Sequence, residues 1–495
     1  MALLEEPIKE VKNVLNYING EWVESKGKIV DVVDPATQKT IAKVPISTKD
    51  EIGAAVNAAK EAFPDWRRTT PLARTRILFR LKALLEDNFE EISRIQTQEH
   101  GKCIDESRGE TRRGIENVEV ACGIPTLMQG YYSEDIASGI DEWVIPSSLG
   151  VFGIIGPFNF PFMIPLWSAP YAVATGNCVV IKPSSEVPLS QMKLAELAEE
   201  AGFPPGVWNV VNGGRDVVDS MLEHPDIKGI TFVGSTPTGK IIYRRCGETQ
   251  KRVIAQCGAK NTMIVMPDAN IKSTVAACLT SFFGNAGQRC LAAANLMIAG
   301  DDDKFYYSFM DAVADAVSKI KVGCGLDESI QMGPLRDKSK KENVIKYIEA
   351  GIKEGAKLRL DGRNVKIIGN YPDTAFLGPT IFENVAPTMS IAREEIFGPV
   401  MSVMRVKNLD QAIQICNSSN YGNGNSIFTN SGKDARYFIY NIESGNVGVN
   451  VGVVAPVAFF PFSGEKDSFY GVLHTQGKEA VRFFTKSKVV IQRWF

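Results

Sequence analysis

The chain of 495 residues is poor in histidine, in paired cysteines and in long uncharged segments free of proline. It has three histidines, and none is spaced with another histidine or a cysteine as zinc ligands are, which argues against a metal site. Its nine cysteines stand singly without a CxxC motif, a pattern typical of a reduced, cytosolic protein. The net charge of -2 gives no electrostatic indication of nucleic-acid binding.

The N-terminus and the longest uncharged segment give no sign of export or membrane insertion. The first residues, MALLEEPIKEVKN, include early acids and no apolar core, unlike a signal or transit peptide. Residues 143–181 carry no charge and are long enough to span a membrane, but they contain five prolines. We interpret this segment as a buried strand, a loop and a buried helix. We therefore expect a soluble, cytoplasmic protein with no membrane partner.

The hydrophobic patterns predict an α/β fold with more than one domain, because the chain is too long for a single core. Residues 50–121 show helical spacing of apolar residues. Short β-branched runs then alternate with helical segments, at residues 151–156, 178–182, 207–211, 230–234 and 252–257. This alternation predicts a parallel sheet with crossover helices. A second alternating region covers residues 261–450, and residues 483–494 predict a terminal strand.

Two predicted strand ends offer groups for a dinucleotide, although no GxGxxG motif follows any of these strands. ITFVGSTPTGKII indicates a strand, a turn and a helix start, where free N–H groups at Gly234 and Ser235 would suit a pyrophosphate. CVVIKPSSE ends a strand at Lys182, in a position to contact a ribose or phosphate. Neither motif is specific alone, since an ordinary strand-to-helix turn has the same pattern.

Two other positions have unusual neighbours. Asn159, in GPFNFP, places an amide in an apolar loop, where it either pins the loop or stabilises an oxyanion. Cys290, in GNAGQRC, follows glycines and polar residues that are poor core sequence, and Arg289 beside it could stabilise a thiolate. These residues alone leave open whether Cys290 is an inert buried cysteine or a nucleophile.

Five motifs occur in one order along nearly the full chain: GPFNFP, FVGSTPTG, GNAGQRC, EEIFGPV and PFSG. Together they resemble the aldehyde dehydrogenase superfamily. Within it, FNFPFMIPLW, CGAKN, VMPDAN and SFYGVLHTQGK resemble the coenzyme A-acylating methylmalonate-semialdehyde dehydrogenases. The resemblance implies an aldehyde dehydrogenase-like α/β fold that forms a homodimer or homotetramer. It implies a dinucleotide-binding domain (1–130 and 150–258), a catalytic domain (259–450) and a small β oligomerisation element (131–149 and 480–495).

The resemblance also implies roles for individual residues. Cys290 is the implied nucleophile, and Asn159 with the Cys290 N–H forms the implied oxyanion hole. Arg113 and Arg289 are implied to hold a substrate carboxylate. Thiolate addition to the aldehyde gives a thiohemiacetal, and hydride transfer to a nicotinamide leaves a thioester. The implied cofactor-binding residues are Ile155, Phe158, Lys182, Ser185, Gly234, Ser235, Glu395 and Phe397.

The chain departs from the usual family pattern at the general base. Hydrolytic members have a glutamate in ELGGK, whereas this chain reads QCGAK with Gln256 there, and an amide cannot take a proton in this role. We expect coenzyme A to accept the acyl group, because a thiol is a better nucleophile than water. Methylmalonate or malonate semialdehyde would then give propionyl- or acetyl-CoA with loss of carbon dioxide.

Two alternatives stay open at this stage. One is a hydrolytic enzyme for an acidic aldehyde such as succinate semialdehyde, with another carboxylate in place of Gln256. The other is a non-catalytic family member, against which Cys290, Asn159 and Glu395 argue. NAD is the expected cofactor, but Ser185 stands where the family usually has a glutamate for the adenine ribose. Without that carboxylate the repulsion against a 2′-phosphate is lost, so NADP use is open.

Overall fold

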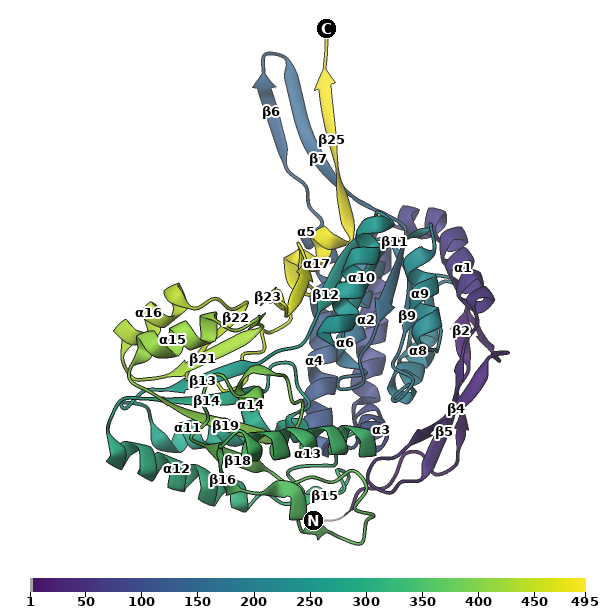
Figure 1. The fold of residues 1–495 in the computed structure, drawn as a ribbon. Coiled ribbons are helices and arrows are strands. Elements are labelled where there is room, and N and C mark those ends of the chain that lie inside the picture. Colours follow the sequence, from purple (N-terminus) through teal and green to yellow (C-terminus); the bar gives the residue numbers. More distant parts are fainter. Residues whose placement is uncertain (1–2) are drawn as a thin grey trace.

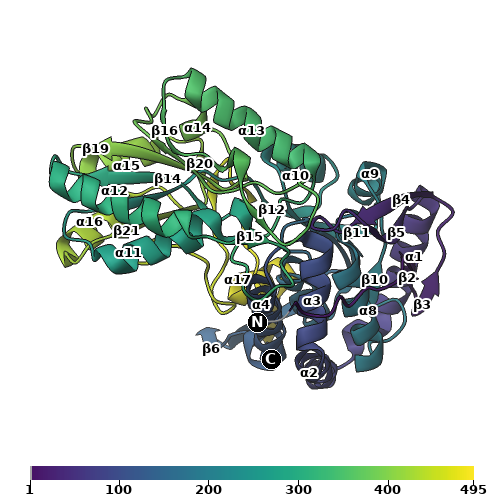
Figure 2. The same ribbon diagram turned by 90° about the horizontal axis from the view of Figure 1, so that it is seen from below.

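The computed structural model describes residues 3–495 and consists of two lobes, each built on a mostly parallel sheet, with a three-stranded arm (Figure 1). The two lobes lie side by side (Figure 2). Each lobe has its own large cluster of buried apolar residues. The chain therefore divides its core between two sheets, as its length predicts.

The first lobe has an eight-stranded sheet whose five central strands are parallel. The five β-branched runs expected from the sequence all lie in these strands, which confirms them. In sheet order the strands are β24 (Phe469–Gly471), β12 (Arg252–Gln256), β11 (Ile227–Val233), β8 (Val151–Ile155), β9 (Cys178–Lys182), β10 (Trp208–Val210), β2 (Asn16–Ile18) and β3 (Glu21–Val23).

Helices pack on this sheet and on one another, and the helical pattern over residues 50–121 is confirmed. The first of them starts with a capping box, in which Thr48 and Glu51 satisfy each other's backbone N–H groups. The helices are α1 (Lys49–Arg68), α2 (Pro71–Asp87), α3 (Phe89–His100), α4 (Ile104–Cys122), α5 (Ile124–Leu127), α8 (Leu189–Ala201), α9 (Arg215–Glu223) and α10 (Thr236–Glu248).

The uncharged segment differs in one respect from its expected form. It contains the buried strand β8 and a loop, but two short helices follow, α6 (Met163–Leu166) and α7 (Ala169–Ala174), instead of one. Pro165 lies in α6 and Pro170 lies in the first turn of α7, and in one continuous helix neither proline could donate the backbone hydrogen bond of a helix interior. Over residues 3–495, no helix combines the length and the apolar character needed to cross a membrane.

The second lobe has a seven-stranded sheet, antiparallel only at the β16–β18 pair. Its strands, in sheet order, are β16 (Lys357–Leu360), β18 (Thr380–Glu383), β19 (Val400–Val406), β14 (Ala293–Ala299), β13 (Asn261–Val265), β21 (Gly424–Phe428) and β22 (Asn446–Val449). Its helices are α11 (Ile271–Cys278), α12 (Asp303–Ser318), α13 (Lys338–Lys353), α14 (Ser390–Arg393), α15 (Leu409–Asn417) and α16 (Gly432–Asn441).

Short strands pair outside the two large sheets. A three-stranded sheet lies near the N-terminus, and two pairs of two-residue strands lie in loops. These strands are β1 (Lys12–Asn13), β5 (Thr40–Ile46) and β4 (Lys28–Val33), then β15 (Val322–Gly323) with β17 (Ile367–Ile368), and β20 (Tyr421–Gly422) with β23 (Glu465–Lys466).

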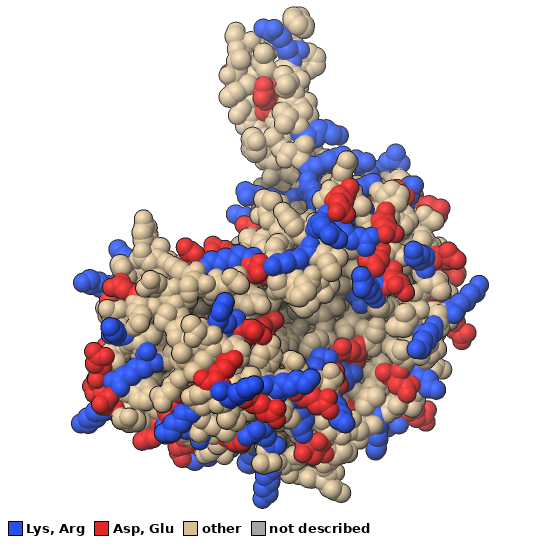
Figure 3. Space-filling view, viewed as in Figure 1, with Lys and Arg blue, Asp and Glu red and all other residues tan. Residues whose placement is uncertain are grey.

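The arm consists of β6 (Tyr132–Ala137), β7 (Ile140–Ser148) and β25 (Thr485–Arg493), all antiparallel, with the C-terminus at its tip (Figure 1). Most atoms on its visible face are uncharged (Figure 3). The expected start of the C-terminal strand was wrong. Helix α17 (Gly477–Phe483) occupies that part of the chain, because Val481 and Phe483 are buried in the core of the first lobe.

Candidate active site

Cys290 lies in an irregular segment between α11 and β14. The chain passes through a π-helical turn (Leu279–Phe283) and a tighter turn (Gly284–Gly287) before it. A Cβ at Gly287, whose φ is +72°, would lie 2.2 Å from the Gly398 carbonyl oxygen, so only glycine fits there. The Cys290 side chain is half-buried, whereas the other eight cysteines are buried. Of the nine cysteines, Cys290 is therefore the one whose thiol this irregular segment leaves partly exposed.

A cavity of about 580 Å³ exposes the Cys290 thiol at the carboxyl ends of β8, β11 and β12. Ligands of parallel sheets commonly bind at this edge. Seven of the residues predicted from the sequence line this cavity together, namely Phe158, Asn159, Gly234, Ser235, Cys290, Glu395 and Phe397.

Three other predicted cofactor residues do not line the cavity. Ile155 is buried in β8. The Lys182 ammonium donates to the carbonyls of Pro183 (2.6 Å) and Gly213 (3.1 Å), and burial lowers its pKa to about 8. The Ser185 hydroxyl also donates to Gly213 O (3.0 Å), and Ser184 lines the cavity in its place. Lys182 and Ser185 thus fix the loop beside the cavity.

The peptide of Cys290 is held from behind by two amides. The side-chain Nδ2 atoms of Asn261 and Asn423 each donate to Cys290 O at 2.8 Å. The pKa of the thiol is raised to about 12 by burial and by the charge of Glu395. The backbone N–H groups of Cys290 and Leu291 and the Asn423 amide act in the opposite direction. The sulfur is therefore a thiol until something removes its proton.

Asn159 faces the same cavity from the loop after β8. Its Nδ2 donates to Gln288 O at 3.0 Å, and its backbone carbonyl accepts from the Lys102 ammonium at 2.6 Å. An asparagine amide has two N–H donors, so one is still available for an oxygen beside Cys290. The Lys102 ammonium also binds Glu110 at 2.6 Å, and both side chains are fully buried. This buried ion pair fixes the position of the Asn159 loop.

Aromatic side chains form part of the cavity wall. Phe158 and Phe397 meet edge to face, with ring centroids 5.9 Å apart, and the Lys340 ammonium lies 4.5 Å from the Phe158 ring. The φ of Phe397 is +55°, a region that costs a bulky residue of order 1–3 kcal/mol. Such strain persists only where the surroundings hold the residue in place, and here it directs an aromatic ring into the cavity.

An apolar cluster lies on the other side of Cys290. Five buried residues form it, and Cys290 packs against them; they are Ile164, Trp167, Val233, Leu291 and Phe462. The nucleophile candidate therefore lies between a cleft with polar groups and an apolar wall. A small aldehyde reaching Cys290 would contact this wall.

The two predicted substrate arginines have different surroundings. The Arg289 guanidinium binds Glu106 at 2.8 Å and Thr280 O at 3.3 Å, while its buried Nε has no partner among the residues that the structure describes. Gly284 makes room for it, since a Cβ there would lie 2.7 Å from the guanidinium. Arg113 is partly exposed and pairs with Glu116 at 3.4 Å. The Arg289 charge is paired with Glu106, and Arg289 is not among the groups that shift the pKa of Cys290, so the structure lends no support to a thiolate-stabilising role.

Gln256 ends β12 and is 2% exposed. Its Nε2 donates to Phe462 O at 2.7 Å, and its buried Oε1 accepts no hydrogen bond from any described residue. The amide thus tethers the loop that contains the PFSG motif. A carboxylate at this position would face the Phe462 carbonyl, so the amide suits the site that it occupies.

Comparison with known proteins identifies the family to which the chain belongs. A model described as the aldehyde dehydrogenase family matches residues 22–490. The chain belongs to the aldehyde dehydrogenase family. A malonate-semialdehyde dehydrogenase of Bacillus subtilis is 48% identical over 488 residues, covering 98% of both chains. One of Bacillus velezensis is 47% identical over 487 residues, again covering 98% of each.

Solved structures of the aldehyde dehydrogenase family have the same fold. A methylmalonate-semialdehyde dehydrogenase of Oceanimonas doudoroffii is 42% identical, with a TM-score of 0.95 over 98% of both chains. A Sinorhizobium meliloti protein complexed with NAD is 37% identical, with a TM-score of 0.96 over 98% of this chain and 99% of that one. The aldehyde dehydrogenase fold expected from the motifs is therefore confirmed.

Proposed function

We propose that this chain is an NAD-dependent, coenzyme A-acylating dehydrogenase of malonate and methylmalonate semialdehyde. Support comes from the names of relatives that match over nearly the whole chain. The observation that carries the proposal is Gln256, an amide tethered to Phe462 O where hydrolytic members have a carboxylate. With no base at that position, a thiol acceptor replaces water.

The residues of the cleft fit a dinucleotide. A Cβ at Gly234 would meet the Phe232 ring at 2.4 Å, so no side chain stands in front of helix α10. The Ser235 hydroxyl bonds Thr238 Oγ1 at 3.0 Å and leaves first-turn N–H groups uncapped, which suits a pyrophosphate. Glu395 and Phe397 would contact the nicotinamide half. The related Sinorhizobium protein is complexed with NAD, which favours NAD over NADP. Bound there, the nicotinamide supplies the hydride acceptor.

Within this proposal, Cys290 is the nucleophile and Asn159 an oxyanion donor. The sulfur adds to the aldehyde carbon, and negative charge develops on the former carbonyl oxygen. The free N–H of the Asn159 amide and the N–H of Cys290 are available to bind that oxygen. After oxidation the acyl group is a thioester on Cys290, and coenzyme A takes it by thiol exchange. The carboxylate β to the thioester carbonyl leaves as carbon dioxide, and the carbanion left on the α-carbon, stabilised as the thioester enolate, takes up a proton from water.

Arg289 is the proposed anchor of the substrate carboxylate, with Arg113 as its companion. The unpartnered Nε of Arg289 supports this, because a buried guanidinium N–H requires an acceptor. We expect Arg289→Leu to raise the KM for methylmalonate semialdehyde roughly 10- to 100-fold, which is the change in affinity expected when a charged hydrogen bond is lost. The KM for propanal should change little, and Arg112→Leu serves as a control. An equal change for both aldehydes would contradict the assignment.

We also propose three domains, an oligomeric assembly and a cytoplasmic location for this chain. The division into dinucleotide-binding, catalytic and oligomerisation parts follows the two sheets and the arm. The arm leaves an unpaired edge on β6 and β25, and an exposed edge strand favours pairing with another copy. A homodimer or homotetramer is therefore proposed. The nine cysteines are free, which supports a reducing cytoplasmic location.

The proposed function is tested by NADH formation from methylmalonate semialdehyde with and without coenzyme A, with products identified by mass spectrometry. We expect fast turnover only with coenzyme A, giving propionyl-CoA. Full turnover without it, giving a free acid, would contradict the proposal and indicate a hydrolytic enzyme. The absence even of a stoichiometric burst of NADH would indicate a non-catalytic member.

A further inference from the structure

Among the described residues, the lining of the cavity that exposes Cys290 has a single carboxylate, that of Glu395. Gln256 cannot take up a proton, and its Nε2 is committed to Phe462 O. The other ionisable residues lining the cavity are Lys340 and two cysteines, Cys257 and Cys290 itself. The thiol must lose a proton before its sulfur becomes a good nucleophile. Glu395 is therefore the one base of suitable charge that the cavity offers.

The Glu395 carboxylate is held by one oxygen and open at the other. Its Oε1 accepts from Ala259 N at 2.8 Å, and Oε2 forms no hydrogen bond with the described residues. Gly258 borders this second oxygen, and a Cβ there would lie 2.6 Å from it. Because Gly258 has no side chain, Oε2 stays accessible from the cavity. A carboxylate oxygen has two lone pairs, so a ribose contact leaves room for a proton.

A second cavity, also of about 580 Å³, is lined by Lys260 and by Glu394, the residue before Glu395. Three buried polar atoms in its lining residues have no hydrogen-bond partner in the described part of the chain: Lys260 Nζ, Asn295 Oδ1 and Ser390 Oγ. Buried polar groups without protein partners are normally satisfied by water. The second cavity is thus a polar chamber, and two of its lining residues, Lys260 and Glu394, are next in sequence to Ala259 and Glu395, which are joined by a hydrogen bond.

We propose that Glu395 accepts the proton that the Cys290 thiol loses, and that Lys260 passes it to the water of the second cavity. The S–H bond breaks as an O–H bond forms on Glu395. The sulfur then bonds to the aldehyde carbon while the carbonyl π pair moves to oxygen. The proton moves on to neutral Lys260 and leaves as solvent proton. This inference rests on the proposed function and adds the proton acceptor that Gln256 cannot be.

The charges around these groups are consistent with the path. Burial raises the pKa of Glu395 to about 7, opposed by Ala259 N–H and Lys260. Burial lowers the pKa of Lys260 to about 7, opposed by Glu395 and Glu394. Cys257, Cys290, Tyr347 and Tyr421 also face Glu395 and feel its charge. At pH 8, Glu395 is able to accept a proton and Lys260 is largely neutral.

The test is the rate at which iodoacetamide alkylates Cys290 between pH 5 and 10, followed by peptide mass spectrometry with Cys290→Ser as the blank. No aldehyde, NAD or coenzyme A is needed, so the result is independent of the proposed function. We expect the native rate to rise through an inflection near pH 7 as Glu395 ionises. Glu395→Gln should remove this inflection and slow alkylation at pH 8 roughly tenfold or more.

The sign of the Glu395→Gln effect separates this role from a merely electrostatic one. The Glu395 charge raises the pKa of Cys290, so removing a bystander carboxylate would lower that pKa and speed alkylation. Lys260→Met should move the inflection to higher pH, since the cation lowers the pKa of Glu395, and Lys260→Arg should restore it in part. Glu99→Gln is the control, because Glu99 is also buried with its pKa raised to about 7 but lies outside both cavities.

Three results would overturn the proposal. Equal or faster alkylation of Glu395→Gln at pH 8 would exclude Glu395 as the acceptor. A native profile without an inflection near pH 7 would do the same, even if the variant does not fold. An inflection that stays in place in Lys260→Met would exclude Lys260 from the path.

Discussion

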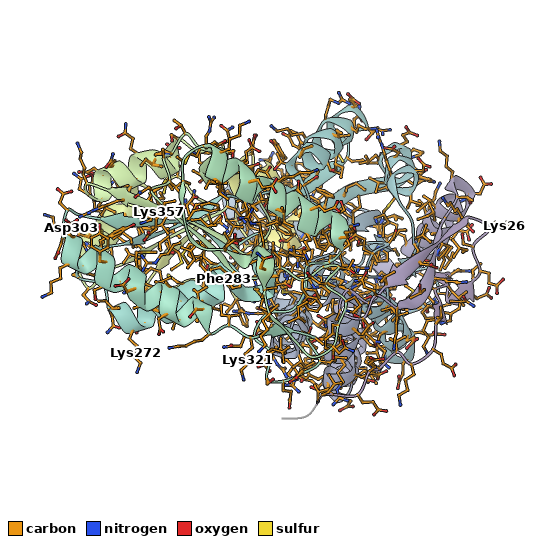
Figure 4. All side chains as sticks on the ribbon, turned by 60° about the horizontal axis from the view of Figure 1, so that its bottom comes forward. Lys26, Lys272, Phe283, Asp303, Lys321 and Lys357 are labelled. Atoms are coloured by element: carbon orange, nitrogen blue, oxygen red, sulfur yellow. The ribbon has the colours of Figure 1, made fainter. Side chains whose placement is uncertain are left out.

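Lys102 and Lys260 are both buried lysines near the candidate active site, but only Lys102 has partners. Lys102 is 1% exposed, and its ammonium binds Glu110 and Asn159 O, each at 2.6 Å. Lys260 is 5% exposed, and its ammonium forms no hydrogen bond within residues 3–495. Surface lysines such as Lys26 and Lys272 instead project into solvent (Figure 4). Both buried lysines thus differ from the solvent-exposed lysines, Lys102 as a buried paired charge and Lys260 as a buried unpaired amine.

The difference indicates two uses of a buried cation. A paired charge is expensive to separate, so Lys102 and Glu110 form a fixed support for the Asn159 loop. Glu110 extends this support by accepting from Phe162 N and Met163 N at 2.9 and 3.1 Å. An unpaired buried ammonium lowers stability and changes its protonation readily. A lysine kept in that condition is suited to exchanging a proton, which is the role inferred for Lys260.

The largest expected effect on stability is that of Lys102→Met. It would leave the Glu110 carboxylate buried without its cation, so we expect the free energy of unfolding to fall by about 3–5 kcal/mol. Urea unfolding at pH 7.5 measures the change. The double variant Lys102→Met/Glu110→Gln should recover part of the loss, because the charge is removed with its partner. A loss below about 1 kcal/mol in the single variant would show that the pair is not a structural support.

Asn159→Ala tests the role of the residue whose loop the Lys102–Glu110 pair holds in place. Removing one oxyanion donor lowers kcat by about 10²–10³-fold in enzymes of comparable chemistry, and we expect a loss of that size with little change in KM. Steady-state rates with methylmalonate semialdehyde measure it, with Asn417→Ala, whose amide bonds Asn441 O far along the chain, as control. If Lys102 acts through Asn159, Lys102→Met/Asn159→Ala should have the kcat of Asn159→Ala alone. Additive losses would separate the two residues.

Lys260→Met should have the opposite sign from Lys102→Met. An unfolded lysine has a pKa of about 10.4, and the folded value here is about 7, so the native state binds fewer protons in that window. Native stability should therefore rise from pH 7 to pH 10. The variant should show a flat or falling profile and exceed the native protein at pH 7 by roughly 1–3 kcal/mol. Urea unfolding at pH 7, 8.5 and 10 tests this, and a destabilised variant at pH 7 would mean that Lys260 has a favourable partner.

Sequence patterns predict much of the fold because the helical spacing of apolar residues and the β-branched runs of strands are both visible in short stretches of sequence. Runs such as residues 178–182 are β-branched and fully buried, and the strand β9 has the same bounds. The predictions went wrong where proline divided α6 from α7, and where burial of Phe483 extended helix α17 into the expected strand. Both depend on details of packing that a short sequence window does not contain.

The sequence predicts the motif residues of the candidate site but not the charged residues that surround them. Cys290, Asn159 and Glu395 lie in short motifs that name the family, and the structure places them in one cavity. Lys102, Glu106 and Glu110 lie in a helical region where charges usually face solvent, so nothing in their spacing distinguishes them from surface residues. Lys260 falls inside the CGAKN motif, but its lack of a partner is visible only once β13, α14 and the second cavity surround it.

Arg112→Gln gives the smallest expected effect and shows what burial adds to an ion pair. Arg112 lies on α4, two residues after Glu110. Its guanidinium donates to both carboxylate oxygens of Glu86, at 2.7 and 2.9 Å. Its side chain is 46% exposed, and water screens such a pair, so we expect a loss of less than about 1 kcal/mol that shrinks further in high salt. Urea unfolding at low and high salt measures it beside Lys102→Met. Comparable losses in the two variants would mean that geometry, and not removal from water, sets the strength of the Lys102–Glu110 pair.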